Sequence, residues 1–400
     1  MKKPSRNEAG LDRREFGRVA LAGALGGNAL FSLTGAAEDK SQILESKMKI
    51  AAQMSASLSD EEIRFVRQLG IDHVVIWTGG TNATYDSFVR LRKKAETAGL
   101  RIWNIGNVDV HNMEEVTLNL PGRDEKIAQY IQYLRDIGRV GGIHYTTYAH
   151  MGNGIWSTKP ETTRGGARAR AFDLSKATQG RWNGKVFRMP LTHGRTYTEQ
   201  EIWDNYAYFI KKVAPVAEEK GIRIGIHPDD PPALELGGVP RCIFSSFDGY
   251  RRALDIANSP NVGMCLCVGC WLEGGELMGK DIIETIRYFG ERKKIFKVHF
   301  RNVSAPLPHF VETFLDNGYM NMYEVMRALR EVDFDGVIIT DHLPYMNKPA
   351  TAFAHAAGYM RALIERANAE FGVSRHVRRS ASTKAVTSKM SPAGVDGVPV

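Results

Sequence analysis

The chain has 400 residues, of which 43% are hydrophobic and 24% are charged, as in an ordinary soluble globular protein. Its net charge of +8 is concentrated at the two ends: residues 1–37 hold six Lys or Arg and three Asp or Glu, and residues 373–400 hold five and one. Because these ends account for +3 and +4, the remaining chain carries only +1, which argues against nucleic acid as a partner.

Residues 1–37 have the pattern of an export signal. The adjacent Arg13 and Arg14 precede an apolar run over 19–33 and a small-residue segment over 34–37. This order predicts a twin-arginine-type signal peptide, and therefore an exported, periplasmic protein that is cytoplasmic only if the signal is not used. The apolar run is shorter than the roughly 20 residues that a membrane span requires, so we expect no stable span after cleavage. Retention as an anchor is the alternative.

Apolar, β-branched segments alternate with amphipathic segments from residue 45 to residue 370. The expected strands are 48–54, 72–78, 100–106, 141–149, 221–227, 261–267, 294–300 and 336–342, and 59–70, 86–99 and 322–334 are the clearest expected helices. Regular strand–helix alternation indicates a parallel sheet, and eight units favour an α/β (β/α)8 TIM barrel. A doubly wound open sheet is the alternative, but no G-x-G-x-x-G follows the first strand.

One connection is much longer than the others. Residues 150–200, after the fourth expected strand, lack a clear helical or strand pattern. A long irregular connection is usually functional or disordered, and after a barrel strand it lies on the catalytic face. We expect either a lid or specificity loop or a solvated insert. The tail over 373–400 is rich in Ser, Thr, Ala and Gly, and we predict that it is disordered.

The last four expected strands each end in a residue type that binds metals. His227, Cys267, His299 and Asp341 are separated by 40, 32 and 42 residues, each about one strand–helix unit. In a barrel these strand ends converge, so the sequence predicts a divalent transition-metal site, with zinc or manganese as its ion. Taken singly, each has another reading: a hydrogen-bonded core histidine, a small apolar cysteine or an aspartate that caps a helix.

Further polar residues lie beside these strand ends. His342 follows Asp341 and is a candidate acid or base, and Arg301 has a guanidinium suited to a substrate carboxylate. Asp229 and Asp230, in the segment IHPDDPP over 226–232, are expected to orient neighbours or substrate hydroxyls. His150, at the start of the long insertion, is a further candidate for substrate binding.

These segments together resemble the mannonate dehydratase family of the TIM-barrel, xylose-isomerase-like type. The resemblance rests on IHPDDPP, on the Cys-Val-Gly-Cys segment over 267–270, on VHFRNV over 298–303, on the terminal Asp341-His342 and on LNLPGRD over 118–124. It implies an enzyme that dehydrates D-mannonate to 2-keto-3-deoxy-D-gluconate with Mn²⁺, or alternatively Zn²⁺ or Fe²⁺. It also implies that His227, Cys267, His299 and Asp341 hold the metal and that His342 transfers protons.

One feature departs from the family pattern. The family places a tyrosine in a Gly-rich loop after the terminal Asp-His, whereas this chain has HLPYMNKPA over 342–350, in which Tyr345 is the substitute candidate. Two other functions therefore stay open: a metal-dependent sugar isomerase or epimerase, and an exported sugar-binding protein without activity. In each case the expected partner is a small sugar or sugar acid, with a homo-oligomer as a possible assembly.

Overall fold

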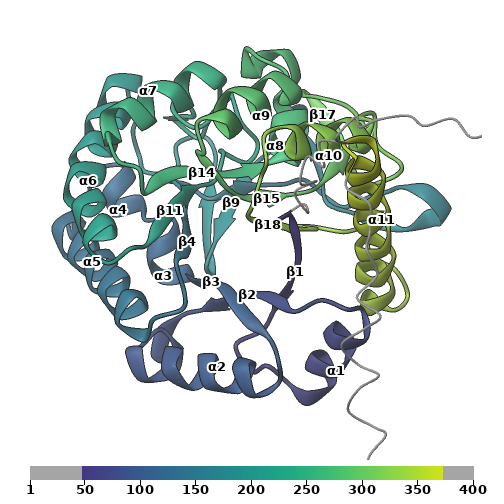
Figure 1. Ribbon diagram of the computed structural model, residues 1–400. Coiled ribbons are helices and arrows are strands. Elements are labelled where there is room, and N and C mark those ends of the chain that lie inside the picture. The colour runs from purple at the N-terminus through teal and green to yellow at the C-terminus, as the bar shows by residue number, and fades with distance from the viewer. Residues whose placement is uncertain (1–46, 373–400) are drawn as a thin grey trace, which may run out of the picture. The chain divides into compact units, whose positions relative to one another are not determined.

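The computed structural model describes residues 47–372, and these form a closed barrel of eight parallel strands (Figure 1). The strands are β1 (Lys49–Met54), β2 (His73–Thr78), β3 (Arg101–Asn107), β4 (Tyr145–Tyr148), β11 (Arg223–Ile226), β14 (Val262–Cys267), β15 (Ile295–His299) and β18 (Val337–Ile339). Each lies within a segment that the sequence predicts, apart from β3, which ends one residue later, so the barrel is confirmed. The expected signal peptide and tail lie outside the described residues.

Long helices surround the barrel (Figure 1). They are α1 (Asp60–Gln68), α2 (Tyr85–Thr97), α5 (Arg123–Val140), α6 (Glu199–Glu219), α7 (Phe247–Ala257), α9 (Ile282–Glu291), α10 (Met322–Glu331) and α11 (Pro349–Glu370). The shorter helices are α3 (Val108–His111), α4 (Glu114–Thr117), α8 (Val268–Gly274), η2 (Gly80–Asn82), η3 (Arg164–Gly166), η4 (Leu174–Lys176) and η5 (Gly275–Met278). The three helices expected from the sequence are confirmed.

Local sequence explains where several helices begin. At α1, the Ser59 side chain accepts from the backbone of Glu62 while the Glu62 carboxylate accepts from the backbone of Ser59. Thr198 and Glu201 repeat this reciprocal cap at α6. Such pairs satisfy backbone N–H groups that the first helical turn leaves without partners, so the strand-to-helix transitions are encoded locally.

Alternation of side chains along the strands divides the apolar core into two parts. Outward residues such as Val74, Ile76 and Ile338 pack with the helices in one large hydrophobic cluster. Ala51, Val75, Val337 and Ile339, on the opposite faces of neighbouring strands, form a separate cluster inside the barrel. This inner packing leaves the polar groups at the carboxyl ends of the strands as the surface on which a site can form.

The insertion after β4 is more regular than the sequence indicates. It contains β5 (Ile155–Trp156), β6 (Glu161–Thr162), β7 (Arg168–Ala169), β8 (Ala171–Asp173), β9 (Gln179–Trp182) and β10 (Lys185–Arg188). Strands β5, β9 and β10 form one sheet, and β8 pairs with β17 (His309–Thr313), which pairs with β16 (Asn302–Val303). Strands β6 and β7 form a two-stranded sheet, and a second such sheet, outside the insertion, joins β12 (Glu235–Leu236) to β13 (Val239–Pro240). Strands of two to four residues are too short to show a period in sequence.

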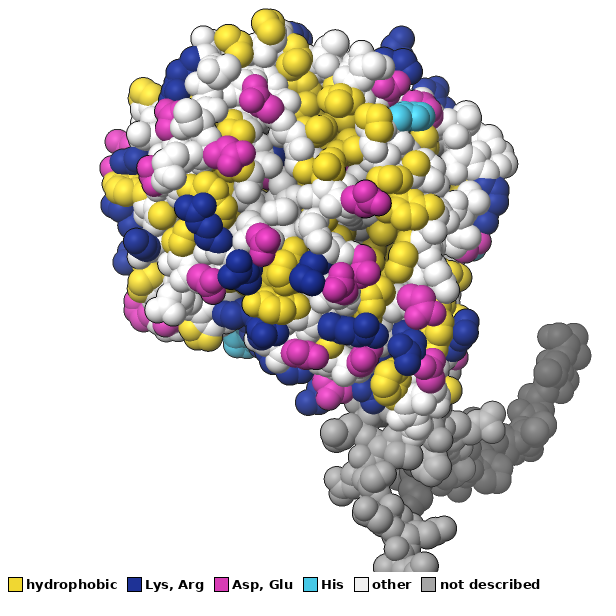
Figure 2. Space-filling view, turned by 90° about the horizontal axis from the view of Figure 1, so that it is seen from above, with side chains coloured by type: hydrophobic (Ala, Val, Ile, Leu, Met, Phe, Trp, Pro, Cys, Tyr) yellow, Lys and Arg dark blue, Asp and Glu magenta, His cyan; other side chains and the backbone are white. Residues whose placement is uncertain are grey.

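The exposed surface mixes charges of both signs. On the face drawn in Figure 2, Lys and Arg side chains lie among Asp and Glu side chains and scattered hydrophobic ones. Ion pairs between neighbouring helices, such as Arg287–Glu331 at 3.1 Å, follow the same pattern. None of the helices within residues 47–372 has the length and apolar character needed to cross a membrane.

Candidate metal centre

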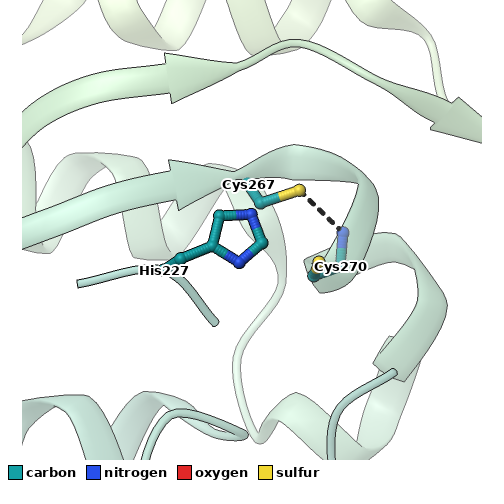
Figure 3. A group of neighbouring side chains, drawn as sticks. All are labelled: His227, Cys267 and Cys270. Atoms are coloured by element: carbon teal, nitrogen blue, oxygen red, sulfur yellow. Dashed lines mark hydrogen bonds between the residues drawn. The ribbon is translucent and has the colours of Figure 1, made fainter. Parts of the chain in front are cut away.

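The barrel brings the four strand-end side chains together. His227 Nε2 lies 3.2 Å from His299 Nδ1, and His299 Nδ1 lies 3.1 Å from Asp341 Oδ1. Cys267 Sγ lies 3.8 Å from Asp341 Oδ2. Figure 3 shows the His227 ring beside Cys267, at the carboxyl end of β14, with Cys270 one helical turn further on. Side chains from four separate strand ends therefore lie close together, as the sequence predicts, in two candidate donor groups that share Cys267: one with His227 and Cys270, the other with His299 and Asp341.

The position of each donor follows from the barrel backbone. Cys267 and His299 are aligned partners on β14 and β15. His227 directly follows β11, and its backbone N–H donates to the carbonyl of Tyr148 at 2.8 Å. Asp341 lies beyond β18 with φ of 57°, a left-handed conformation that is uncommon outside glycine but tolerated by aspartate. This bend turns its carboxylate toward the histidines.

Charged neighbours alter the pKa values of these donors. Burial opposes ionisation of Cys267, but its contact with Cys270 and the Arg301 charge hold its pKa well below the usual range. Burial also opposes the charge on His299, but Cys265 and Asp341 raise its pKa well above normal. The cluster thus combines anionic sulfur and oxygen with two imidazoles. This donor set fits a divalent transition metal.

Two further cysteines lie beside the donors. Cys265 Sγ is 3.4 Å from His299 Nε2, so the two ring nitrogens of His299 face different partners. Cys267 Sγ accepts from the backbone N–H of Cys270 at 3.4 Å. The sequence predictions omit both residues. The strand period of two could have identified Cys265, because residues 265 and 267 share one face of β14.

Arg301 is fully buried, and its guanidinium faces carboxylates of the protein itself. It lies 2.8 Å from Glu273 and 3.1 Å from Asp341, and it also pairs with Glu312. Its Nη2 is 3.4 Å from Cys267 Sγ. The expected contact with a substrate carboxylate is not supported by this placement, because the guanidinium is enclosed by protein groups and its charge is paired with three carboxylates. The geometry favours a positioning role toward Cys267 and Asp341.

His342 lies beside Asp341, and Glu312 holds it. His342 Nδ1 lies 2.9 Å from Glu312 Oε1, and Arg170 Nη1 lies 2.9 Å from the same oxygen. Partial burial opposes the charge on His342, but Asp341 and Glu312 outweigh it and raise the pKa to about 9. Sequence reasoning did not identify Glu312, which lies on the short strand β17 outside the barrel pattern.

The insertion forms the wall of a cavity beside this site. The cavity has a volume of about 1000 Å³, and Ile155, Lys159, Arg170, Arg181, His309 and His342 are among its lining residues. All of these except His309 and His342 belong to the insertion. The insertion is therefore placed to control which molecules reach His342, which supports the expected specificity role over that of a solvated insert.

The two aspartates of IHPDDPP are buried and already paired. Asp229 Oδ2 accepts from Ser245 Oγ at 2.7 Å, and Asp230 Oδ1 pairs with Arg170 Nη2 at 2.5 Å. This agrees with the expectation that they orient neighbours, and it leaves their expected contact with substrate hydroxyls as a prediction. Asp230 thereby connects the turn after β11 to the insertion.

His150 and Tyr345 lie apart from the donors. His150 is enclosed by aromatic rings, its Nδ1 is 2.7 Å from the Tyr148 hydroxyl, and burial lowers its pKa to about 3. Tyr345 has a relative exposure of 68%, and its backbone N–H donates to the carbonyl of Arg168 at 2.7 Å. Neither residue is among those that line the cavity beside His342. Their expected substrate and catalytic roles stay predictions without support from this geometry.

Comparison with known proteins agrees with these features. The architecture is that of the xylose-isomerase-like TIM barrels: the solved structure of L-ribulose 3-epimerase covers 82% of this chain and 99% of its own with a TM-score of 0.54. At 15% identity this similarity shows the fold alone. Within that class, residues 62–370 match the family model described as D-mannonate dehydratase (UxuA), and the chain belongs to this family of hydro-lyases.

Individual relatives support the same assignment. The mannonate dehydratase of Streptococcus equi subsp. zooepidemicus is 29% identical over 276 residues, covering 64% of this chain and 74% of its own. That of Thermotoga maritima is 28% identical over 285 residues, covering 64% and 77%. The crystal structure of mannonate dehydratase from Streptococcus suis serotype2 is 25% identical, with a TM-score of 0.69 and coverage of 81% and 96%. The family assignment favours a dehydratase over an isomerase or an inactive binding protein.

Proposed function

We propose that this enzyme is a metal-dependent hydro-lyase that converts D-mannonate to 2-keto-3-deoxy-D-gluconate, with Mn²⁺ as its cofactor and Zn²⁺ or Fe²⁺ as alternatives. The observation that carries the proposal is the convergence of Cys267, His299 and Asp341, whose ligand atoms all lie within 4.8 Å of one another, in a chain of this family. The partner is accordingly a small sugar acid. A homo-oligomer stays a prediction.

His227, Cys267, His299 and Asp341 would hold the ion. A divalent metal held there would supply a Lewis acid that stabilises the negative charge that develops when the C2 proton leaves. Arg301 orients two of these donors through its contacts with Cys267 and Asp341. Its complete burial keeps this arrangement fixed, because the guanidinium has no solvent with which to exchange partners.

The reaction requires one proton to leave C2 and the C3 hydroxyl to leave as water, after which the enol becomes the 2-keto product. His342 is the proton-transfer group in this proposal. Its Nδ1 is engaged by Glu312 at 2.9 Å, which leaves Nε2 as the atom available to the cavity. Glu312 thus plays the orienting role that a carboxylate commonly has toward a catalytic histidine.

Export is part of the proposal but rests on sequence alone. The paired Arg13 and Arg14 with the following apolar run support a twin-arginine signal, and this segment lies outside the described residues. Fractionation of cells that express the full-length chain checks it, with an Arg13→Lys, Arg14→Lys variant as the control. Equal distribution of both forms between cytoplasm and periplasm would contradict export.

Purified enzyme incubated with D-mannonate and Mn²⁺ tests the function. We expect a 2-keto-3-deoxy acid, identified by mass spectrometry and by the loss of one water. D-Mannose and D-fructose are the control substrates, and we expect neither to be converted. Interconversion of these neutral sugars without any acid product would instead support the isomerase or epimerase alternative.

A further inference from the structure

Charged side chains on the cavity wall fall into two groups. Most are paired: Lys176 lies 2.5 Å from Asp173, His309 lies 3.0 Å from Glu161, and Arg170 contacts three carboxylates. Lys159 and Arg181 differ, because within residues 47–372 neither forms an ion pair or a side-chain hydrogen bond. The cavity therefore presents two positive charges without a carboxylate partner among these residues, and Glu161, whose partner His309 is charged only when protonated, lies on the same wall.

The backbone that carries these two side chains is well anchored. Arg181 lies on β9, the central strand of its sheet, and is aligned with Ile155 on one side and Val186 on the other. Lys159 follows Thr158, whose N–H donates to the carbonyl of Ala171 at 2.9 Å. Both residues are exposed, so their charged groups reach the solvent that fills the cavity. A cation on a fixed strand loses less freedom when it binds an anion than one on a mobile loop.

The charge on Arg301 is compensated within the protein. This side chain is fully buried and pairs with Glu273, Glu312 and Asp341. Arg170 is compensated in the same way by Asp230, Glu273 and Glu312. An acidic molecule that enters the cavity therefore meets free positive charge at Lys159 and Arg181 rather than at the arginines nearest the donors.

We propose that Lys159 and Arg181 bind a carboxylate of the substrate and are the residues that select acidic over neutral sugars. The inference rests on the proposed function, because it assigns specificity to that same site. The proposal assigns the selection of acidic over neutral sugars to residues of the insertion and not to residues of the barrel strands. The guanidinium of Arg181 can donate two parallel hydrogen bonds to a carboxylate, and Lys159 adds a point charge.

Binding measurements test this independently of turnover. Isothermal titration calorimetry of the Mn²⁺-loaded full-length protein compares D-gluconate with D-glucitol, which replaces the carboxylate by a neutral alcohol. We expect the Lys159→Gln, Arg181→Gln double variant to lose about tenfold or more in D-gluconate affinity, as for a lost charge-assisted contact, with D-glucitol affinity unchanged. Added salt should weaken D-gluconate binding in the parent protein more than in the variant.

Lys176→Gln is the matched control, because Lys176 lines the same cavity but is paired with Asp173. We expect it to change D-gluconate affinity by less than about twofold, as for an exposed and already compensated charge. With D-mannonate as substrate, the double variant should raise KM about tenfold while kcat stays within about threefold, because it removes binding and not chemistry.

Two results would overturn the inference: unchanged D-gluconate affinity in the double variant, or an equal loss for D-glucitol. Both are distinct from failure of the proposed function. If the parent protein does not dehydrate D-mannonate, the comparison of D-gluconate with D-glucitol still decides whether Lys159 and Arg181 select an acid. Thermal unfolding of each variant verifies that the fold is intact.

Discussion

Each half of the barrel holds two buried histidines near strand ends, but the pKa values of the two pairs shift in opposite directions. In the N-terminal half, His111 and His150 have pKa values lowered to about 3 by burial. In the C-terminal half, the pKa values of the buried His227 and His299 are raised despite burial. The difference lies in the neighbours: a backbone carbonyl and a tyrosine hydroxyl in the first half, and thiol and carboxylate groups in the second.

This comparison explains why histidine alone is a weak signal of a metal site. All four side chains are buried near the carboxyl ends of their strands, but only His227 and His299 lie where anionic donors from other strands converge. A neutral buried imidazole with one hydrogen-bonded nitrogen, as in His111 and His150, is compatible with a core position and needs no metal. The anionic partners, and not the histidines, distinguish the candidate metal centre.

Removal of a donor from the C-terminal half should have the largest effect. We expect Cys267→Ala to lower bound metal from about one ion per chain to below about 0.1, and to reduce activity about a thousandfold, since several kcal/mol of charge stabilisation are lost. Elemental analysis of the purified protein and a D-mannonate assay measure both. Cys242→Ala is the control, because Cys242 is absent from the donor groups. Full metal content in Cys267→Ala would contradict the ligand assignment.

Glu312→Gln should have an intermediate effect, because it leaves the donors in place and removes the carboxylate beside His342. We expect kcat to fall about a hundredfold, as for other carboxylates that orient a catalytic group, with KM and metal content nearly unchanged. Steady-state kinetics with elemental analysis separate these quantities, and Glu312→Asp should recover part of kcat. Glu161→Gln, which removes a carboxylate elsewhere on the cavity wall, is the control. If kcat is unchanged in Glu312→Gln, the orienting role is wrong.

A change in the N-terminal half should affect stability and not chemistry. We expect His150→Phe to lower the free energy of unfolding by about 1 kcal/mol, because the Tyr148 hydroxyl loses a buried partner. Metal content and KM for D-mannonate should stay within about twofold of the parent values, since His150 does not line the cavity. Urea unfolding and steady-state kinetics measure these effects. A tenfold rise in KM would instead restore the substrate-binding role that the sequence suggests for His150.

Much of the candidate site was predictable because barrel closure follows a simple rule. Once eight strand–helix units are recognised, the carboxyl ends of the strands must meet, and His227, Cys267, His299 and Asp341 come together from segments far apart in sequence. Cys265 was also within reach of this reasoning, through the strand period of two. Glu273 and Glu312 were not, because their burial depends on how α8 and β17 pack around Arg301.

The sequence by itself determined the barrel and which residues lie at its strand ends, because each barrel strand and long helix is encoded by a local pattern and closure then places the strand ends. Tertiary structure alone decided the roles of the charged residues. Arg301 becomes buried and paired through contacts with α8 and β17, whereas Lys159 and Arg181 have no ion-pair partner among residues 47–372. The pairs of Arg170 with Glu273 and Glu312 join residues more than 100 positions apart, and no local period in the sequence records them.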